Sequence, residues 1–338
     1  MIPFRLLGPV SLYTGYAVGF RGLAMKLLQR PDLDIDLRAV MDNVAPEVEP
    51  ELLAAVKQVK NYTDLGVLVG FPRHSLHLGT RHKIIYSMYE ANDLPFDWKS
   101  HVATASEVWV PTRFCADVFG KYNRRIKIVP WGIDADVFKR GKRERSDDFV
   151  FGAVGVQSPR KGTDVMVEGV KRAFGGRSGV RLVIKTRDTK YLPPIDDERI
   201  TVIDEDWPEE KLVQFYRAID CLVAPSRGEG ILMSPLQAAA CGTPSLVTNW
   251  SGPADYVDDN GIWGIRIKGL VRASRTMAKG AYWAEPDAGH LAELMQWAVD
   301  TRPEVTGDYS RWTLQSQADH FCEYLKSAWG RAVEGRLP

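Results

Sequence analysis

The sequence is poor in cysteine and has no long apolar run. Its 338 residues contain four scattered cysteines (Cys115, Cys221, Cys241 and Cys322) and no C-x-x-C pair. This spacing argues against a disulfide framework or a zinc site and favours a reducing compartment. No stretch approaches the ~18 apolar residues of a transmembrane helix, and the start, MIPFRLLGPVSLYTG, lacks the apolar core of a secretory signal. We therefore expect a cytoplasmic protein without a transmembrane segment.

An excess of charge of one sign is also missing. The formal net charge is +1, so no overall positive field demands a nucleic-acid partner. Hydrophobic residues make up 45% and charged residues 26%, which is ordinary for a globular protein. A chain of 338 residues is long for a single core and sufficient for two domains.

Strand-like and helix-like segments alternate along the chain. Short apolar runs typical of buried strands occur at 4–8, 35–40, 65–70, 83–86, 107–110, 126–129, 149–156, 181–185, 200–203, 221–224 and 245–247. Helical patterns include 15–28, 51–59, 111–122, about 287–300 and about 309–330, and a further helix with Pro208 at its first position. The alternation predicts an α/β protein with two Rossmann-like, doubly wound parallel sheets. A charged stretch at 139–148 marks the expected boundary, which gives domains 1–140 and 141–308.

The most informative segment runs from Cys221 to Val247. An apolar strand leads into the turn Pro225-Ser226-Arg227-Gly228-Glu229-Gly230, a helix-forming run at 235–240 follows, and Cys241-Gly242 ends it before the next strand. A turn in this place presents backbone N–H groups and one end of a helix at the carboxyl edge of a parallel sheet, where α/β proteins bind ligands.

These residues resemble the nucleotide-sugar motif of retaining glycosyltransferases of family 4 type, which have the GT-B fold. That motif reads S-x-x-E-G-F-G-L, then a second Glu, then A-x-A-C-G-T-P-V. Ser226, Glu229, Gly230 and the run Ala240-Cys241-Gly242-Thr243-Pro244 match it. Gln237 stands in place of the second Glu, and Leu232 in place of the second Gly. The resemblance implies two Rossmann-like domains facing an interdomain cleft, with the last segment, 309–338, crossing back to the first domain.

The resemblance also implies roles at the donor side. Glu229 would bind hydroxyls of the donor sugar, and Gln237 would take the ribose position with a weaker, uncharged bond. The backbone of Gly230, Ile231, Leu232 and Met233 would complete the donor site. The loop at 155–164 would hold the diphosphate through Lys161; Val156 stands where the family has an Arg, a contact that Arg160 could supply instead.

The first domain carries further matching segments. Tyr13-Thr14-Gly15-Tyr16 resembles the glycine turn that approaches the donor, so Gly15 is assigned to donor binding and Tyr16 to the acceptor side. The segments at 86–98, 105–114 and 129–138 are similar to family segments in order and spacing. Glu90 would orient or deprotonate the acceptor hydroxyl, and the resemblance extends from about residue 4 to residue 300.

Three further residues complete the expected acceptor side: His74, His77 and Arg81 lie in one basic, histidine-rich loop. The loop has no acid at a spacing that suits a metal, so no metal site is expected there. Asp134-Ala135-Asp136 imitates a metal-binding D-x-D, but it belongs to the matching 129–138 segment and is interpreted as structural. Lys, Arg and helix dipoles would stabilise the leaving diphosphate instead.

The sequence therefore predicts a glycosyltransferase, a hexosyl- or pentosyltransferase with Glu229, Lys161 and Glu90 at its centre. It would use a nucleoside diphosphate sugar as co-substrate and no other cofactor, with retention and without a metal. The acceptor stays open: a glycan, a small molecule, or a modified base in DNA as in virus-encoded transferases. A catalytically degenerate homologue that binds a sugar or a partner is a further alternative, because Gln237, Leu232 and Val156 depart from the motif. An epimerase of the same two-domain build is a rival on fold alone.

Overall fold

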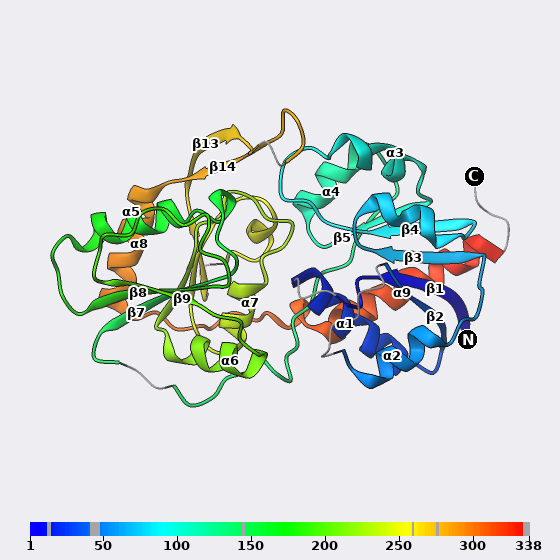
Figure 1. The fold of residues 1–338 in the computed structure, drawn as a ribbon, viewed down its shortest axis with the longest axis horizontal. Helices are drawn as coiled ribbons and strands as arrows, with labels where there is room; N and C mark the ends of the chain where they lie inside the picture. Colours follow the sequence, from blue (N-terminus) through cyan, green and yellow to red (C-terminus); the bar gives the residue numbers. More distant parts are fainter. Residues whose placement is uncertain (12–14, 41–47, 144–145, 259, 275–276, 334–338) are drawn as a thin grey trace. The chain divides into compact units, whose positions relative to one another are not determined.

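The computed structural model describes residues 1–338 except 12–14, 41–47, 144–145, 259, 275–276 and 334–338. The chain divides into two compact units (Figure 1). Unit 1 comprises Met1–Tyr89, Asp93–Asp134 and Ser310–Pro338, and unit 2 comprises Glu90–Asn92 and Ala135–Tyr309. Each unit is built around its own parallel sheet, so each is described by itself.

Unit 1 contains a six-stranded parallel sheet in the order β2-β1-β3-β4-β5-β6. Its strands are β1 (Ile2–Gly8), β2 (Leu33–Ala39), β3 (Leu65–Val69), β4 (His82–Tyr86), β5 (Glu107–Val110) and β6 (Ile126–Ile128). The helices are α1 (Gly15–Leu28), α2 (Pro50–Lys57), α3 (Phe96–Thr104), α4 (Arg113–Gly120) and α9 (Leu314–Val333), and η1 (Pro72–Leu78) is a 3₁₀ helix. Every residue of β3 is buried, as expected for an interior strand of a parallel sheet.

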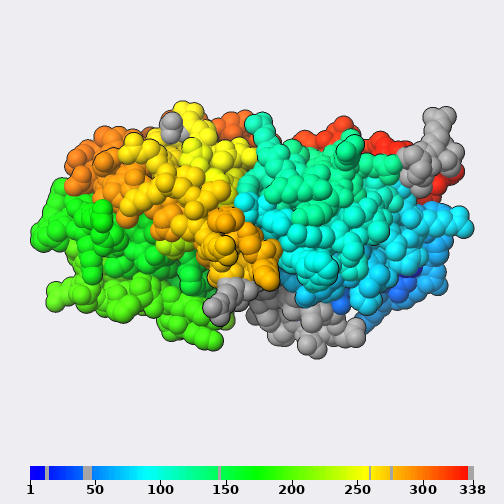
Figure 2. Space-filling model, turned by 90° about the horizontal axis from the view of Figure 1, so that it is seen from above, coloured from blue at the N-terminus to red at the C-terminus, as the bar shows by residue number. Residues whose placement is uncertain are grey.

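The C-terminal helix α9 packs on unit 1 through an apolar stripe at helical spacing. Its buried residues are Leu314, Gln317, Ala318, Phe321, Cys322, Leu325 and Ala328. Phe321 contacts Phe4 of β1 and Trp109 of β5, with ring centroids 6.2 and 5.0 Å away. In the space-filling view the red C-terminal segment lies against the teal part of unit 1 (Figure 2). Segments from both ends of the sequence therefore share one core.

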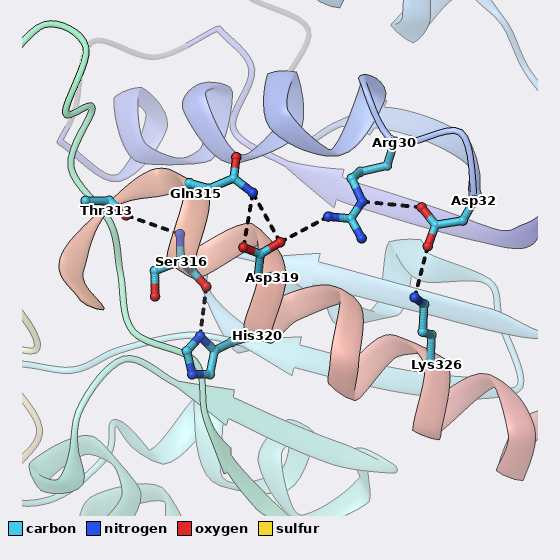
Figure 3. Close-up of polar contacts among 8 residues, drawn as sticks. All are labelled: Arg30, Asp32, Thr313, Gln315, Ser316, Asp319, His320 and Lys326. Atoms are coloured by element: carbon cyan, nitrogen blue, oxygen red, sulfur yellow. Dashed lines mark hydrogen bonds and ion pairs between the residues drawn. The ribbon is translucent and has the colours of Figure 1, made fainter. Parts of the chain in front are cut away.

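Polar contacts at the edge of this packing are partly exposed. Arg30, just after α1, pairs with Asp32 and with Asp319 of α9, and Lys326 pairs with Asp32 (Figure 3). A buried contact reinforces them, since the Gln317 side chain accepts from the backbone N–H of Gly132 at 2.9 Å. The apolar stripe and this buried hydrogen bond, more than the ion pairs, hold α9 in place.

Unit 2 contains a second six-stranded parallel sheet in the order β12-β11-β10-β7-β8-β9. Its strands are β7 (Phe149–Val154), β8 (Val180–Thr186), β9 (Ile200–Asp204), β10 (Cys221–Ala224), β11 (Ser245–Thr248) and β12 (Ile262–Ile265). Its helices are α5 (Thr163–Phe174), α6 (Glu209–Ala218), α7 (Met233–Ala240) and α8 (Ala288–Thr301), with the short 3₁₀ helices η2 (Pro159–Lys161) and η3 (Gly252–Asp255). An antiparallel ribbon of β13 (Ile267–Arg272) and β14 (Tyr282–Pro286) adds to this sheet fold.

The prediction of two doubly wound parallel sheets is confirmed. Every predicted strand is present with its ends shifted by at most two residues, and α1 has the predicted bounds. The sequence interpretation missed α3, β12 and the ribbon, and it put Pro208 one position too far into α6, where it is the N-cap residue. Part of the predicted glycine turn (Tyr13 and Thr14) and two residues of the predicted boundary stretch (144–145) lie outside the described residues. Among the helices described, none is long and apolar enough to cross a membrane.

Candidate active site

In the unit 2 sheet, the order in which successive strands are added reverses between the neighbouring strands β7 and β10. From β7 the chain passes through α5 to β8 on one side, and from β10 it passes through α7 to β11 on the other. The loops after these two neighbouring strands therefore leave in opposite directions and open a crevice at the carboxyl edge. Doubly wound sheets bind their ligands at this kind of switch point.

The two loops touch through a glycine. Gly162, between η2 and α5, has φ +69°, a left-handed conformation that favours glycine. A Cβ atom there would lie 2.1 Å from the carbonyl oxygen of Pro225, which no side chain allows. The backbone N–H of Arg227 also donates to the carbonyl of Arg160 at 2.7 Å. The fit between the β7 and β10 loops thus depends on Gly162.

The carboxylate of Glu229 lies between two cations in this crevice. Its Oε1 is 2.8 Å from Nζ of Lys161, and its Oε2 is 2.6 Å from Nη1 of Arg160. Glu229 is only 4% exposed. Burial disfavours its charged form, but the fields of Arg160 and Lys161 outweigh burial and lower the pKa of Glu229. Three residues predicted for the donor side therefore come together.

The backbone around Glu229 is fixed by the loop after β11. The N–H of Glu229 donates to Oγ of Ser251 at 3.0 Å, and the N–H of Gly252 donates to the carbonyl of Glu229 at 2.9 Å. The Tyr256 hydroxyl donates to the carbonyl of Leu232, the residue before α7. A small hollow beside this backbone is lined by Gln157, Lys161, Ser226, Leu232 and Ser234. The predicted donor-side run 230–233 is thus held next to the cations by backbone contacts.

The sequence interpretation missed Arg227, which connects three segments around the crevice. Its guanidinium pairs with Asp164 of α5 and Glu285 of β14, at 2.7 and 2.8 Å, and donates to the carbonyl of Pro159. The pKa of Asp164 is lowered because this pairing outweighs the effect of its burial. Arg227 therefore ties η2, α5 and the ribbon to the Glu229 loop. Its partners are 58 and 63 residues away in the sequence, so no local pattern indicates them.

Two of the three departures from the motif, Gln237 and Val156, have different surroundings. Oε1 of Gln237 accepts a hydrogen bond of 2.9 Å from the buried Tyr216 hydroxyl of α6. Val156 is 39% exposed and brings no charge to the loop after β7. Arg160, four residues on, supplies the guanidinium that reaches Glu229. The crevice therefore has two cations even though the position occupied by Val156 is apolar.

The residues predicted for the acceptor side do not all lie together. Tyr16 and the predicted donor-side residue Gly15 begin α1 after β1, and His74 lies on η1 after β3, so these residues are at the carboxyl edge of the unit 1 sheet. His77 lies near the end of η1, one turn beyond His74. Arg81 immediately precedes β4 and donates its N–H to the carbonyl of Thr63, just before β3. It therefore lies at the amino edge, and the structure separates it from the other candidates.

Glu90 groups with unit 2 rather than with the rest of the first half of the chain. Burial raises its pKa, Arg160 opposes this shift, and the negative charge of Glu229 adds to it. A carboxylate with a raised pKa suits proton transfer. Within the described part of the chain, no three His, Cys, Asp or Glu side chains are grouped so that they could hold a metal ion.

Comparison with protein families gives a match in unit 2. Residues 148–280 match the family described as glycosyl transferases group 1. The D-inositol 3-phosphate glycosyltransferase of Acidothermus cellulolyticus is 28% identical over 217 residues, which cover 57% of this chain and 48% of that protein. The enzyme of the same description from Mycobacteroides abscessus is 34% identical over 215 residues, covering 55% and 46%. The chain thus spans about half the length of these curated relatives.

Solved structures resemble the chain over nearly its whole length. HepE of Anabaena, solved with UDP and glucose, has a TM-score of 0.64 and 12% identity, covering 97% of this chain and 100% of that one. Sucrose-phosphate synthase of Thermosynechococcus elongatus has a TM-score of 0.65 and 14% identity, covering 100% and 98%. Identities this low show the fold, which agrees with the GT-B prediction.

Proposed function

We propose that this chain transfers a sugar from a nucleoside diphosphate sugar to an acceptor hydroxyl, because residues 148–280 match the glycosyl transferases group 1 family and the chain has a GT-B fold. The observation that carries the proposal is the pairing of Glu229 with Lys161 and Arg160 at the switch point of the unit 2 sheet. In this crevice Glu229 would accept hydrogen bonds from the sugar hydroxyls, and Lys161 and Arg160 would donate hydrogen bonds to the diphosphate.

The two cations would stabilise the diphosphate as it leaves. They are fixed before the reaction, since Arg160 also donates to the carbonyl of Gly228 at 2.7 Å and Lys161 is held by Glu229. Preorganised positive charge of this kind lowers the barrier without reorganisation during the reaction. Lys161 and Arg160 therefore take the role that a metal ion has in other transferases, and the proposed reaction needs no metal.

The proposed chemistry retains the anomeric configuration. The bond between the anomeric carbon and the diphosphate oxygen breaks, and the diphosphate leaves with the electron pair. The acceptor oxygen bonds the same face of the anomeric carbon, and its proton passes to the departing diphosphate. Glu90 would orient the acceptor hydroxyl. A double displacement would need a carboxylate nucleophile, whereas Glu229 is engaged by two cations.

The first test is calorimetric titration with UDP, GDP, ADP, TDP and CMP. UDP is the leading candidate because the similar HepE structure was solved with it. Lys161→Ala should weaken binding about tenfold or more, since a charge-assisted hydrogen bond contributes about 1.5–3 kcal/mol. Lys171→Ala is the matched control, because that lysine lies on the exposed face of α5 in a pair with Asp196. Equal affinities for wild type and Lys161→Ala would remove Lys161 from the donor site.

The contact of Gln237 favours a second candidate, a homologue that binds the donor without turnover. Its amide oxygen already accepts from Tyr216, and an amide contributes a weaker bond than the carboxylate of the family motif. Slow hydrolysis of a UDP-sugar by wild type that disappears in Glu229→Ala would exclude this candidate. Donor binding without hydrolysis or transfer would support it.

A further inference from the structure

A continuous row of aromatic rings crosses the carboxyl edge of the unit 1 sheet. Consecutive ring centroids are 5.2, 5.4, 6.2, 5.1 and 5.3 Å apart. In order, the rings are Tyr89, Trp98, Phe71, Tyr16, Trp131 and Tyr86. Tyr86 is the last residue of β4, and the other rings follow β4, β3, β1 and β6, so the row is built by the fold and not by one sequence segment.

The middle of the row lies at the switch point of this sheet. From β1 the chain passes through α1 to β2 on one side, and it returns to β3 on the other side of β1. Tyr16 follows β1 and Phe71 follows β3, so the two rings flank the place where the loops diverge. Ligands of doubly wound sheets bind at this position.

The row is buried except at this point. Tyr86, Tyr89, Trp98 and Trp131 are all buried, whereas Phe71 is 44% exposed and Tyr16 is partly exposed. Trp131 is also held by α1, where a Cβ on Gly19 would lie 2.2 Å from its Nε1 atom. Buried rings thus support Phe71 from the side, and an aromatic surface that is already ordered loses little entropy when a ligand binds.

The polar groups beside Phe71 match the rim of a polyhydroxylated ring. The guanidinium carbon of Arg73 lies over the Phe71 ring, 5.5 Å from its centroid, and the His74 ring centroid lies 6.1 Å from it. Burial lowers the pKa of His74, and the charge of Arg73 and the neighbouring His77 lower it further, which favours the uncharged imidazole. Nε of Arg73 donates to Nε2 of His74 at 3.4 Å, so the neutral imidazole carries its proton on Nδ1 and can donate it to a hydroxyl.

We propose that Phe71, Tyr16, Arg73 and His74 form an aromatic shelf that binds the acceptor as a sugar or cyclitol ring. The ring's C–H face would lie against the part of Phe71 that Arg73 leaves exposed, and its hydroxyls would reach Arg73 and His74. This assignment rests on the proposed glycosyltransferase function and narrows its acceptor class. A nucleic-acid acceptor fits less well, because Arg73 has Asp97 4.0 Å away and the chain's net charge is +1, whereas binding to nucleic acid is driven by many phosphate contacts.

The test measures ring binding and donor binding separately. Saturation-transfer NMR in the presence of UDP would use glucose, myo-inositol, a myo-inositol monophosphate and a duplex oligonucleotide as probes. At least one ring should bind to wild type, and Phe71→Ala should weaken that binding about tenfold or more. Phe71→Trp keeps an aromatic face and should retain binding. A difference between the neutral and the phosphorylated cyclitol that Arg73→Ala removes would assign an anionic substituent to Arg73.

Matched controls come from the same surface. Leu76 on η1 and Phe96 at the start of α3 are 70% and 92% exposed, and neither belongs to the ring row. Leu76→Ala and Phe96→Ala should leave ring binding unchanged. Arg81→Ala is the control for Arg73→Ala, because Arg81 lies at the opposite edge of the sheet.

The outcomes separate the shelf from the donor site. UDP binding with no ring bound, or ring binding equal in Phe71→Ala and wild type, overturns the shelf and leaves the donor site standing. Binding of the oligonucleotide alone also overturns it. Ring binding without binding of any nucleotide supports the shelf and overturns the proposed transferase function.

Discussion

At the scale of single residues, the central feature is a carboxylate placed between two cations. Glu229→Gln removes its charge and leaves the half-buried Arg160 and Lys161 without the carboxylate with which they pair. Breaking a buried pair in this way costs about 3–5 kcal/mol. We expect a lower Tm in calorimetry together with loss of UDP-sugar hydrolysis. Glu168→Gln is the control, since its pair with Arg172 on α5 is exposed. An unchanged Tm would mean that the Glu229 pair contributes no net stability.

The same pair gives a pH dependence whose sign follows from its lowered pKa. The pKa of Glu229 in the folded protein lies below its ordinary value of 4.5. The charged form is therefore favoured by folding, and its contribution to stability is complete above about pH 4.5 and is lost as the pH falls through the folded pKa. The free-energy difference between wild type and Glu229→Gln, measured by urea unfolding, should shrink as the pH is lowered from 6 to 3. A constant difference would contradict this assignment.

Gly162 tests how closely the two loops of the crevice must approach. Gly162→Ala combines a positive φ with a Cβ 2.1 Å from Pro225 O, so the β7 and β10 loops must separate. We expect a cost of about 2 kcal/mol or more and reduced UDP affinity in the same titration. Gly176 has open space around its Cα and no positive φ, so Gly176→Ala should be neutral. UDP affinity unchanged in Gly162→Ala would show that loop contact is not needed for binding.

At the scale of elements, packing and not surface charge should hold α9 on unit 1. Phe321 is fully buried against Phe4 and Trp109, and Phe321→Ala should cost about 3–5 kcal/mol. Asp319, whose side chain is 54% exposed, pairs with Arg30 (Figure 3), and Asp319→Ala should cost less than about 1 kcal/mol. Urea unfolding of both variants measures the two costs. Equal losses would mean that the surface network contributes as much as the core.

Helices and strands could be predicted where apolar residues form a continuous run or recur at regular spacing. Elements without either pattern were missed. β3 and β10 are short buried runs, and their sequences indicate strands without further information. β13 is exposed along most of its length and contains Gly269, so it has no alternating pattern, and α3 buries only Trp98 and Val102. At the candidate site, local motifs pointed to Lys161 and Glu229, which the structure brings together. The Arg227 network and the row of rings around Phe71 consist of contacts between distant segments, which a single sequence does not reveal.

At the scale of the whole molecule, the two ends of the chain belong to the same unit. Met1–Tyr89 and Ser310–Pro338 both belong to unit 1. Unit 2 consists of the continuous segment Ala135–Tyr309 and the short segment Glu90–Asn92. Lys161, Arg160 and Glu229 all lie in unit 2. Ending the chain after Tyr309 therefore removes α9 from unit 1 but leaves the proposed donor-site residues of unit 2 in place.

We expect this truncation to separate stability from nucleotide binding. Loss of Phe321 and Leu325 from the unit 1 core should lower the Tm of one transition or abolish it. UDP at 100 times its Kd should still stabilise unit 2 by about 2.7 kcal/mol, because a ligand that binds only the folded state raises its stability by mass action. Differential scanning calorimetry with and without UDP measures both effects, and Lys161→Ala in the truncated chain should remove the shift. If the truncated chain no longer responds to UDP although unit 2 still melts cooperatively, donor binding requires unit 1, and residues such as Gly15 then become the first to test.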